Sequence, residues 1–143
     1  MQQAIFDAYL HHLTAVNNWN LVDASAPHIV GAHLYARDRG LLPQLASASN
    51  MWSRRVAIVA TWYFIRRDDL EDTLQLAKQL LRDRHELIHK ATGWMLREVG
   101  KRDVARLQDF LERYAPQMPR TMLRYAIERL PEVQRQAYLR KRL

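Results

Sequence analysis

Apolar side chains recur at the spacing of an α-helix along almost the whole of this 143-residue chain. Only four glycines and five prolines interrupt the pattern, and no stretch keeps the alternation of a half-buried strand. The pattern therefore predicts an all-α protein. The apolar stripe of the expected first helix consists of Ile5, Phe6, Tyr9, Leu10, Leu13 and Val16.

Turn residues and capping residues divide the rest of the chain into further helices. Pro27 can open a helix, Asn50 is a good N-cap, and Asp69 is expected to cap a helix whose first turn holds Glu71 and Asp72. The expected helices cover residues 27–34, 41–48, 51–65, 70–81, 85–99, 104–114 and 119–130, with a short one from Glu132.

The later part of the chain repeats. Residues 66–70 superpose on residues 100–104 at a shift of 34, which places Arg55 on His89, and a further shift of 31 places His89 on Arg120 and Trp94 on Tyr125. Repeated helix pairs stack into a curved solenoid because one pair cannot bury its faces alone. Arg55, His89 and Arg120 would then line one edge of the concave surface, although other registers of the repeat are open.

Composition narrows the classes of function. The 22 Lys and Arg exceed the 15 Asp and Glu by seven, and the last 31 residues carry eight of these cations and two of the acids. Such a basic field attracts polyanions, or else forms a solvated basic tail. The absence of cysteine excludes disulfides, thiolate catalysis and cysteine-bound metals. No apolar run is long enough to span a membrane and no signal peptide is evident, so we expect a cytoplasmic, nucleoid-associated protein in a reducing compartment.

Three separated segments contain an aspartate, arginines and tryptophans: NNWNLVD at residues 17–23, WSRRVAIVAT at 52–61 and KATGWMLRE at 90–98. In this order they resemble the AlkD-like DNA alkylation repair family, which are HEAT-like-repeat DNA glycosylases. The resemblance runs from about Trp19 to about Arg129 and implies one HEAT-like-repeat domain over residues 1–143, similar to the C-terminal two-thirds of the family domain. Asn20 departs from the pattern, since the family more often has aspartate there.

The resemblance implies hydrolysis of the N-glycosidic bond of cationic alkylated purines, of the 7-methylguanine and 3-methyladenine type, in duplex DNA. It also implies that the base is not fully flipped and that no cofactor is needed. A carboxylate suits this chemistry because it stabilises the positive charge that develops on the sugar. Asp23 lies four residues after Trp19, which places the two on one face if the segment is helical.

The candidate residues follow from these matches. The expected catalytic residues are Asp23, Trp19, Trp94 and Arg55. Asp23 would lie beside the sugar, the two indoles against the sugar and the cationic base, and Arg55 on the neighbouring phosphate. The expected DNA-binding residues are Arg54, Arg55, His89, Lys90, Arg120 and Arg124. No metal site is expected.

Each of these residues also has a structural interpretation. Taken alone, Asp23 reads as an N-cap before Pro27, and Arg54 and Arg55 read as surface charge. Trp52 and Trp62 are expected to fill gaps between helices. The alternative for the whole chain is a non-catalytic HEAT-like scaffold that binds DNA or protein.

A second motif offers a remote alternative. His85-Glu86-Leu87-Ile88-His89 satisfies the H-E-x-x-H pattern of zinc peptidases, with Glu98 or Glu112 as conceivable third ligands. Such peptidases hold substrate beside a strand edge, which an all-helical chain does not offer. We expect His85 at the start of its helix and His11, His12, His28 and His33 at surface or packing positions.

The N-terminal helix has no preceding repeat to cover its outer face, and between Ala4 and Val16 only Asp7 carries a formal charge. Terminal repeats of solenoids normally have a polar outer face. We therefore expect self-association through residues 2–16, beside the main expected partner, duplex DNA with alkylated bases.

Overall fold

The computed structural model of the chain describes residues 2–12 and 19–140, and every regular element within them is helical. The prediction of an all-α protein is confirmed. The elements in chain order, with η marking 3-10 and π turns, are α1 Gln2–His11, α2 Trp19–Ala26, η2 Pro27–Gly31, α3 Ala32–Leu34, α4 Leu41–Ala46, α5 Met51–Ala60, α6 Trp62–Ile65, α7 Glu71–Gln79, η3 Leu80–Arg82, α8 Glu86–Arg102, α9 Val104–Tyr114, η4 Ala115–Gln117, α10 Arg120–Ala126 and α11 Glu132–Arg140.

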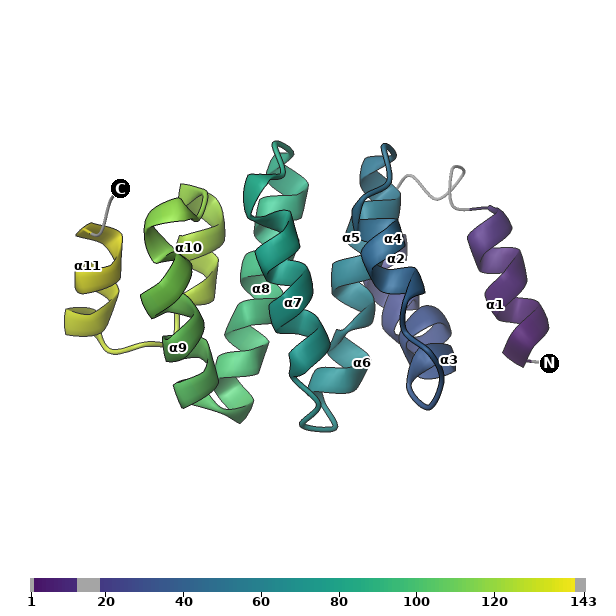
Figure 1. Cartoon of the computed structure of the whole chain (residues 1–143), viewed down its shortest axis with the longest axis horizontal. Coiled ribbons are helices and arrows are strands. Elements are labelled where there is room, and N and C mark those ends of the chain that lie inside the picture. Colours follow the sequence, from purple (N-terminus) through teal and green to yellow (C-terminus); the bar gives the residue numbers. More distant parts are fainter. Residues whose placement is uncertain (1, 13–18, 141–143) are drawn as a thin grey trace.

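The helices follow one another in chain order along the long axis, from α1 at one end to α11 at the other (Figure 1). One layer is formed by α2, α5, α8 and α10, each of which contacts the next. In the second layer α4 packs on α5, α7 contacts α4 and packs on α8, and α9 packs on α8. No helix in the described part of the chain is both long and apolar enough to cross a membrane.

Two glycines allow neighbouring helical elements to approach closely. A Cβ atom on Gly93 of α8 would lie 2.5 Å from the carbonyl oxygen of Met122 and 2.6 Å from the Cβ of Tyr125 in α10. A Cβ atom on Gly31 would lie 2.8 Å from the Cβ of Tyr63. Because no side chain separates the backbones, α8 and α10 bring Trp94 and Tyr125 to one pocket.

Of two predicted N-caps, Asn50 is confirmed and Asp69 is wrong. The side chain of Asn50 accepts a hydrogen bond of 2.8 Å from the amide of Trp52, as an N-cap does. Asp69 does not cap α7, which begins after Leu70 without a side-chain cap. The carboxylate of Asp69 instead accepts a hydrogen bond of 2.8 Å from Arg39.

Several expected helix boundaries also differ. The segment 51–65 is interrupted by a turn at Thr61, which separates α5 from α6, and the hydroxyl of Thr61 donates to the carbonyl of Ile58 at 2.6 Å. Pro27 is the first residue of the π-turn η2, which runs on into α3 as expected for residues 27–34, but the backbone is already helical before it because α2 leads directly into η2. Such a turn accommodates a residue that has no amide hydrogen to donate. Of the expected first helix, Leu13 and Val16 lie outside the described residues.

Candidate active site

A carboxylate and a guanidinium from adjacent helices form a bidentate ion pair. Arg55 of α5 donates from Nε to Oδ1 of Asp23 and from Nη2 to Oδ2, both at 2.9 Å. Its Nη1 donates to the carbonyl oxygen of Leu87 in α8 at 2.5 Å. The side chains of Asp23 and Arg55 are only 17% and 6% exposed. One arginine therefore links α2, α5 and α8 and holds both oxygens of Asp23 in place.

The position of Asp23 follows from the helical conformation of its segment. Asp23 lies in the middle of α2, so the interpretation of this residue as an N-cap before Pro27 is wrong. The helix places the backbones of Trp19 and Asp23 one turn apart on the same face. The indole of Trp19 lies outside the described residues.

A pocket of about 410 Å³ adjoins the ion pair. Its lining combines apolar and aromatic surface with three cationic side chains: Arg55, Leu87, Lys90, Trp94, Arg97 and Tyr125. Trp94 is half-buried, and its ring centroid lies 5.5 Å from that of Trp62. The site thus joins an oriented carboxylate to an aromatic pocket with a basic rim, which suits a cationic ring attached to an anionic backbone.

Three lining residues were not among the predicted site residues. Tyr125 could have been found, because the repeat aligns it with Trp94. Arg97 lies in the same motif as Trp94 and forms an ion pair with Glu128 at 2.5 Å. Leu87 contributes its backbone carbonyl to Arg55, and no side-chain pattern signals such a role.

The predicted DNA-binding residues fall into two groups. The donors of Arg54 are occupied by Asp83, at 2.7 Å, and by the carbonyls of Ala48 and Ser49. His89 is also engaged, with Nε2 at 2.5 Å from the carbonyl oxygen of Asp83. Arg54 and His89 thus both bind Asp83, just before α8 begins.

Lys90, Arg120 and Arg124 form the second group. Lys90 lines the pocket and is half-buried, whereas Arg120 and Arg124 are exposed on α10. Within residues 2–12 and 19–140, none of the three has a carboxylate at ion-pair distance. Their charges are therefore available to a ligand.

The H-E-x-x-H segment lies at the start of α8. His85 lies at the start of its helix, as expected, and is the N-cap: its Nδ1 accepts a hydrogen bond of 3.1 Å from the amide of Leu87. Glu86 accepts a hydrogen bond of 2.6 Å from Thr121 of α10, which lowers the pKa of Glu86. In the described part of the chain, no three His, Asp or Glu side chains are grouped as metal ligands.

One contact joins α1 to the helix that carries Asp23. The hydroxyl of Tyr9 lies 3.0 Å from that of Ser25, which donates to the carbonyl of Leu21 at 2.5 Å. Burial raises the pKa of Tyr9, the charge of Asp23 raises it further, and the hydrogen bond to Ser25 opposes both. Tyr9 therefore stays a neutral hydroxyl at neutral pH.

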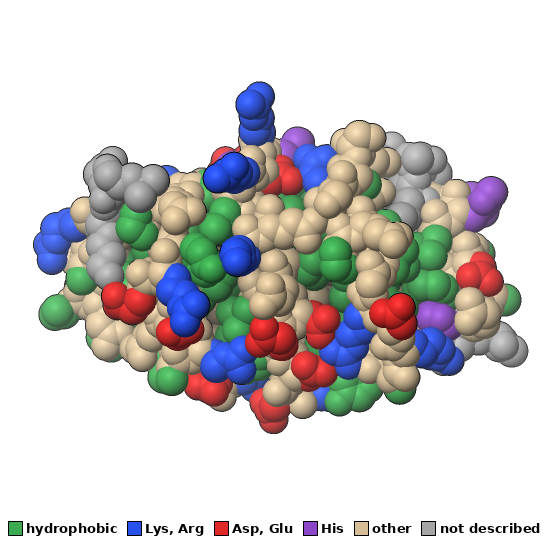
Figure 2. Space-filling view, viewed as in Figure 1, with side chains coloured by type: hydrophobic (Ala, Val, Ile, Leu, Met, Phe, Trp, Pro, Cys, Tyr) green, Lys and Arg blue, Asp and Glu red, His purple; other side chains and the backbone are tan. Residues whose placement is uncertain are grey.

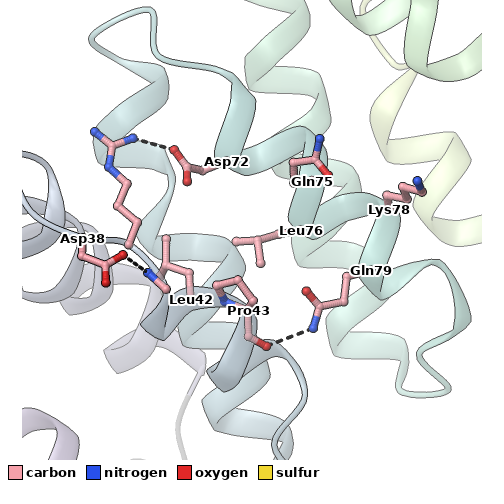
Figure 3. Close-up of a pocket in the computed structure, with 10 residues that line it drawn as sticks. Asp38, Leu42, Pro43, Asp72, Gln75, Leu76, Lys78 and Gln79 are labelled. Carbon is pink, nitrogen blue, oxygen red and sulfur yellow. Dashed lines mark hydrogen bonds and ion pairs between the residues drawn. The ribbon is translucent and has the colours of Figure 1, made fainter.

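A larger pocket, of about 640 Å³, lies between α4 and α7 (Figure 3). Its polar groups mostly satisfy one another: Arg39 binds Asp72, and Gln79 donates to the carbonyl of Pro43 at 3.0 Å. It shares no lining residue with the pocket beside Asp23. Its lining has a carboxylate–guanidinium pair but no aromatic side chain, so we place the candidate active site at Asp23.

The chain belongs to the DNA alkylation repair enzyme family, whose family model matches residues 1–130. The matched residues include the Asp23–Arg55 pair and the whole lining of the pocket beside it. No curated protein and no solved structure is significantly similar to the chain. Membership of this family places the protein in the repair of alkylated DNA and makes DNA its partner.

Proposed function

We propose that the protein is a DNA glycosylase that releases cationic alkylated purines, such as 7-methylguanine and 3-methyladenine, from duplex DNA. The observation that carries the proposal is the Asp23 carboxylate, held at both oxygens by Arg55 beside an aromatic pocket with a basic rim. Family membership supports the choice of alkylated DNA as substrate.

The reaction needs little acid catalysis because the alkylated purine is already a cation. The bond between C1′ and the base nitrogen breaks, its electron pair moves to the base, and the base leaves as a neutral molecule. The sugar then carries oxocarbenium character, which the negative charge of Asp23 stabilises. Water adds at C1′ and loses its proton to solvent.

The geometry leaves Asp23 able to orient that water. A carboxylate has about four acceptor positions, and Arg55 occupies two of them. Arg55 therefore acts in our proposal as a positioning residue rather than as the phosphate clamp expected from the sequence. Trp94 would face the sugar and the cationic base without full flipping of the base.

The available cations would bind the DNA backbone. Lys90 lies in the pocket, and Arg120 and Arg124 are exposed on α10. Arg54 and His89 would contribute indirectly, because both bind Asp83 immediately before α8. This arrangement supports sequence-independent contact with phosphates rather than reading of base edges.

The experiment that tests the function is release of free 7-methylguanine from methylated duplex DNA in the presence of a metal chelator. We expect release, with an abasic site left in the strand. Duplex binding without any release would identify a non-catalytic scaffold instead. Release that the chelator abolishes would indicate a metal-dependent reaction and contradict the proposed mechanism.

We also propose self-association through α1. Phe6 faces inward and is 7% exposed, but Ile5 is 50% exposed and Leu21 on α2 is 53% exposed. Sedimentation at several concentrations should show a dimer that Ile5→Glu shifts toward monomer. A monomer at every concentration would contradict this proposal.

A further inference from the structure

A second group of cations lies where α6 and α8 end. We call it the α6 rim, and it consists of Arg66, Arg67, Lys101 and Arg102. A pocket of about 550 Å³ is lined by Trp62, Ile65, Arg66, Glu98, Lys101 and Arg102. A neighbouring pocket of about 440 Å³ is lined by His28, Tyr63, Arg66 and Arg67. Arg66 lines both, so the two pockets are adjacent.

The α6 rim lies next to the candidate active site. Trp62 lines the pocket at the α6 rim, Trp94 lines the pocket beside Asp23, and the two ring centroids are 5.5 Å apart. Helix α8 contributes to both pockets, with Lys90 at the site and Lys101 at the rim. These lysines are eleven residues apart, or about 16 Å along a helix.

The charge at the α6 rim is only partly neutralised. Lys101 pairs with Glu98 at 3.0 Å, and Arg102 lies 3.8 Å from the exposed Asp68. Among the residues that the structure describes, neither Arg66 nor Arg67 has a carboxylate at ion-pair distance. Four cations thus face two acids. Within the described part of the chain the guanidinium groups of Arg66 and Arg67 have no carboxylate partner, although Nη1 of Arg67 donates to the carbonyl of Tyr63 at 3.0 Å.

The aromatic rings at the α6 rim are covered by these arginines. The guanidinium carbon of Arg67 lies 3.5 Å from the centroid of the Tyr63 ring, and that of Arg66 lies 5.5 Å from the Trp62 ring. Proteins that bind single strands leave aromatic faces open for bases to stack on. Here the rings instead hold the guanidinium groups in place, which favours contact with phosphates over contact with bases.

We propose that the α6 rim binds the phosphates of the second strand of a duplex whose first strand lies at Asp23; this rests on the proposed function. The spacing of about 16 Å between Lys90 and Lys101 exceeds both the roughly 6 Å width of a minor groove and the roughly 12 Å width of a major groove. The two cation groups can therefore contact backbones on opposite sides of a groove. The substrate class that fits is double-stranded DNA.

The test measures binding to unmodified DNA, so that it does not depend on base excision. The slope of log affinity against log salt is compared for the unchanged protein, for Arg66→Ala/Arg67→Ala, and for the control Lys78→Ala/Arg113→Ala. The control removes the same charge from a pocket between α7 and α9. On the α4, α7 and α9 face, acidic and basic side chains are interspersed (Figure 2). Duplex and single-stranded DNA of equal length serve as ligands.

We expect Arg66→Ala/Arg67→Ala to reduce the slope on duplex DNA by about 1.8, or about 0.9 per phosphate contact. The slope on single-stranded DNA and the slopes of the control should stay unchanged. An equal reduction on single-stranded DNA would overturn the proposal and indicate one strand tracking along the groove. No reduction on duplex DNA, or an equal one for the control, would overturn it as well. A protein that passes this test yet releases no base would refute only the glycosylase function.

Discussion

At the scale of single residues, the arrangement at Asp23 depends on the shape of the arginine side chain. The two donors of Arg55 that meet Asp23 are parallel and lie at equal distances of 2.9 Å, while a third donor reaches the carbonyl of Leu87. A lysine ammonium is a point charge and cannot reproduce such a fork. The roles of Arg55 as a positioning group and as a phosphate clamp therefore predict different results for one substitution.

Arg55→Lys should slow single-turnover excision by about 100-fold, the scale of a misplaced catalytic group, while duplex affinity stays unchanged. The measurement is the rate at saturating protein, normalised to the folded fraction. Arg124→Lys, at an exposed position without a carboxylate partner in the described chain, is the control and should excise normally. Undiminished excision by Arg55→Lys would favour the phosphate clamp, because lysine also binds phosphate.

At the scale of elements, close packing of α8 on α10 forms the wall of the pocket that holds Trp94 and Tyr125. Gly93→Ala should destabilise the protein by about 1–3 kcal/mol, because the new methyl group would meet the backbone of Met122 at 2.5 Å. Gly40→Ala is the control, since the nearest atom to its Cβ would be 3.5 Å away. Denaturant unfolding of both variants measures the difference, and equal stability would show that α10 can move aside without cost.

A buried histidine of α3, His33, packs against α1. His33 is 3% exposed and stacks on Phe6 with ring centroids 3.9 Å apart. Among the residues that the structure describes, its Nδ1 has no hydrogen-bond partner. Burial lowers the pKa of His33, the charge of Arg37 lowers it further, and Asp7 opposes the change. The unfolded chain therefore binds more protons than the folded one at mildly acidic pH.

The stability contributed by neutral His33 is complete above the unfolded pKa of about 6.5 and is lost as the pH falls below it. Between about pH 7 and pH 5, the melting temperature of the unchanged protein should fall more steeply than that of His33→Gln. His28→Gln, at an exposed position, should behave like the unchanged protein. Identical slopes for His33→Gln and the unchanged protein would rule out His33 as the source.

Features determined by near neighbours in the chain could be predicted at this scale. Asn50 caps its own helix two residues away, and its role followed from residue type alone. The same argument predicted Asp69 as an N-cap, and this prediction is wrong because Asp69 binds Arg39, which lies 30 residues earlier. The turn at Thr61 was not predicted, because an apolar stripe does not reveal that the hydroxyl of Thr61 bonds to the carbonyl of Ile58.

At the scale of the molecule, helical periodicity predicted the all-α class. The geometry of the site could not be predicted in this way, because it depends on contacts between residues far apart in the sequence. The family resemblance singled out Asp23, Arg55 and Trp94, and the last two line one pocket beside Asp23. Neither spacing nor composition could indicate that Arg55 is bound to Asp23 rather than exposed. The aligned repeat positions also differ in environment: Arg55 and His89 bind protein groups, whereas Arg120 is exposed.

The most direct test of the central claim is single-turnover release of 7-methylguanine from duplex DNA by the unchanged protein and by Asp23→Asn. The substitution keeps the shape of the side chain and removes the charge that stabilises the sugar cation. We predict a rate reduced by at least about 100-fold, the scale of losing one preorganised electrostatic group, with duplex binding retained. Excision by Asp23→Asn at the unchanged rate, with normal binding, would contradict the account.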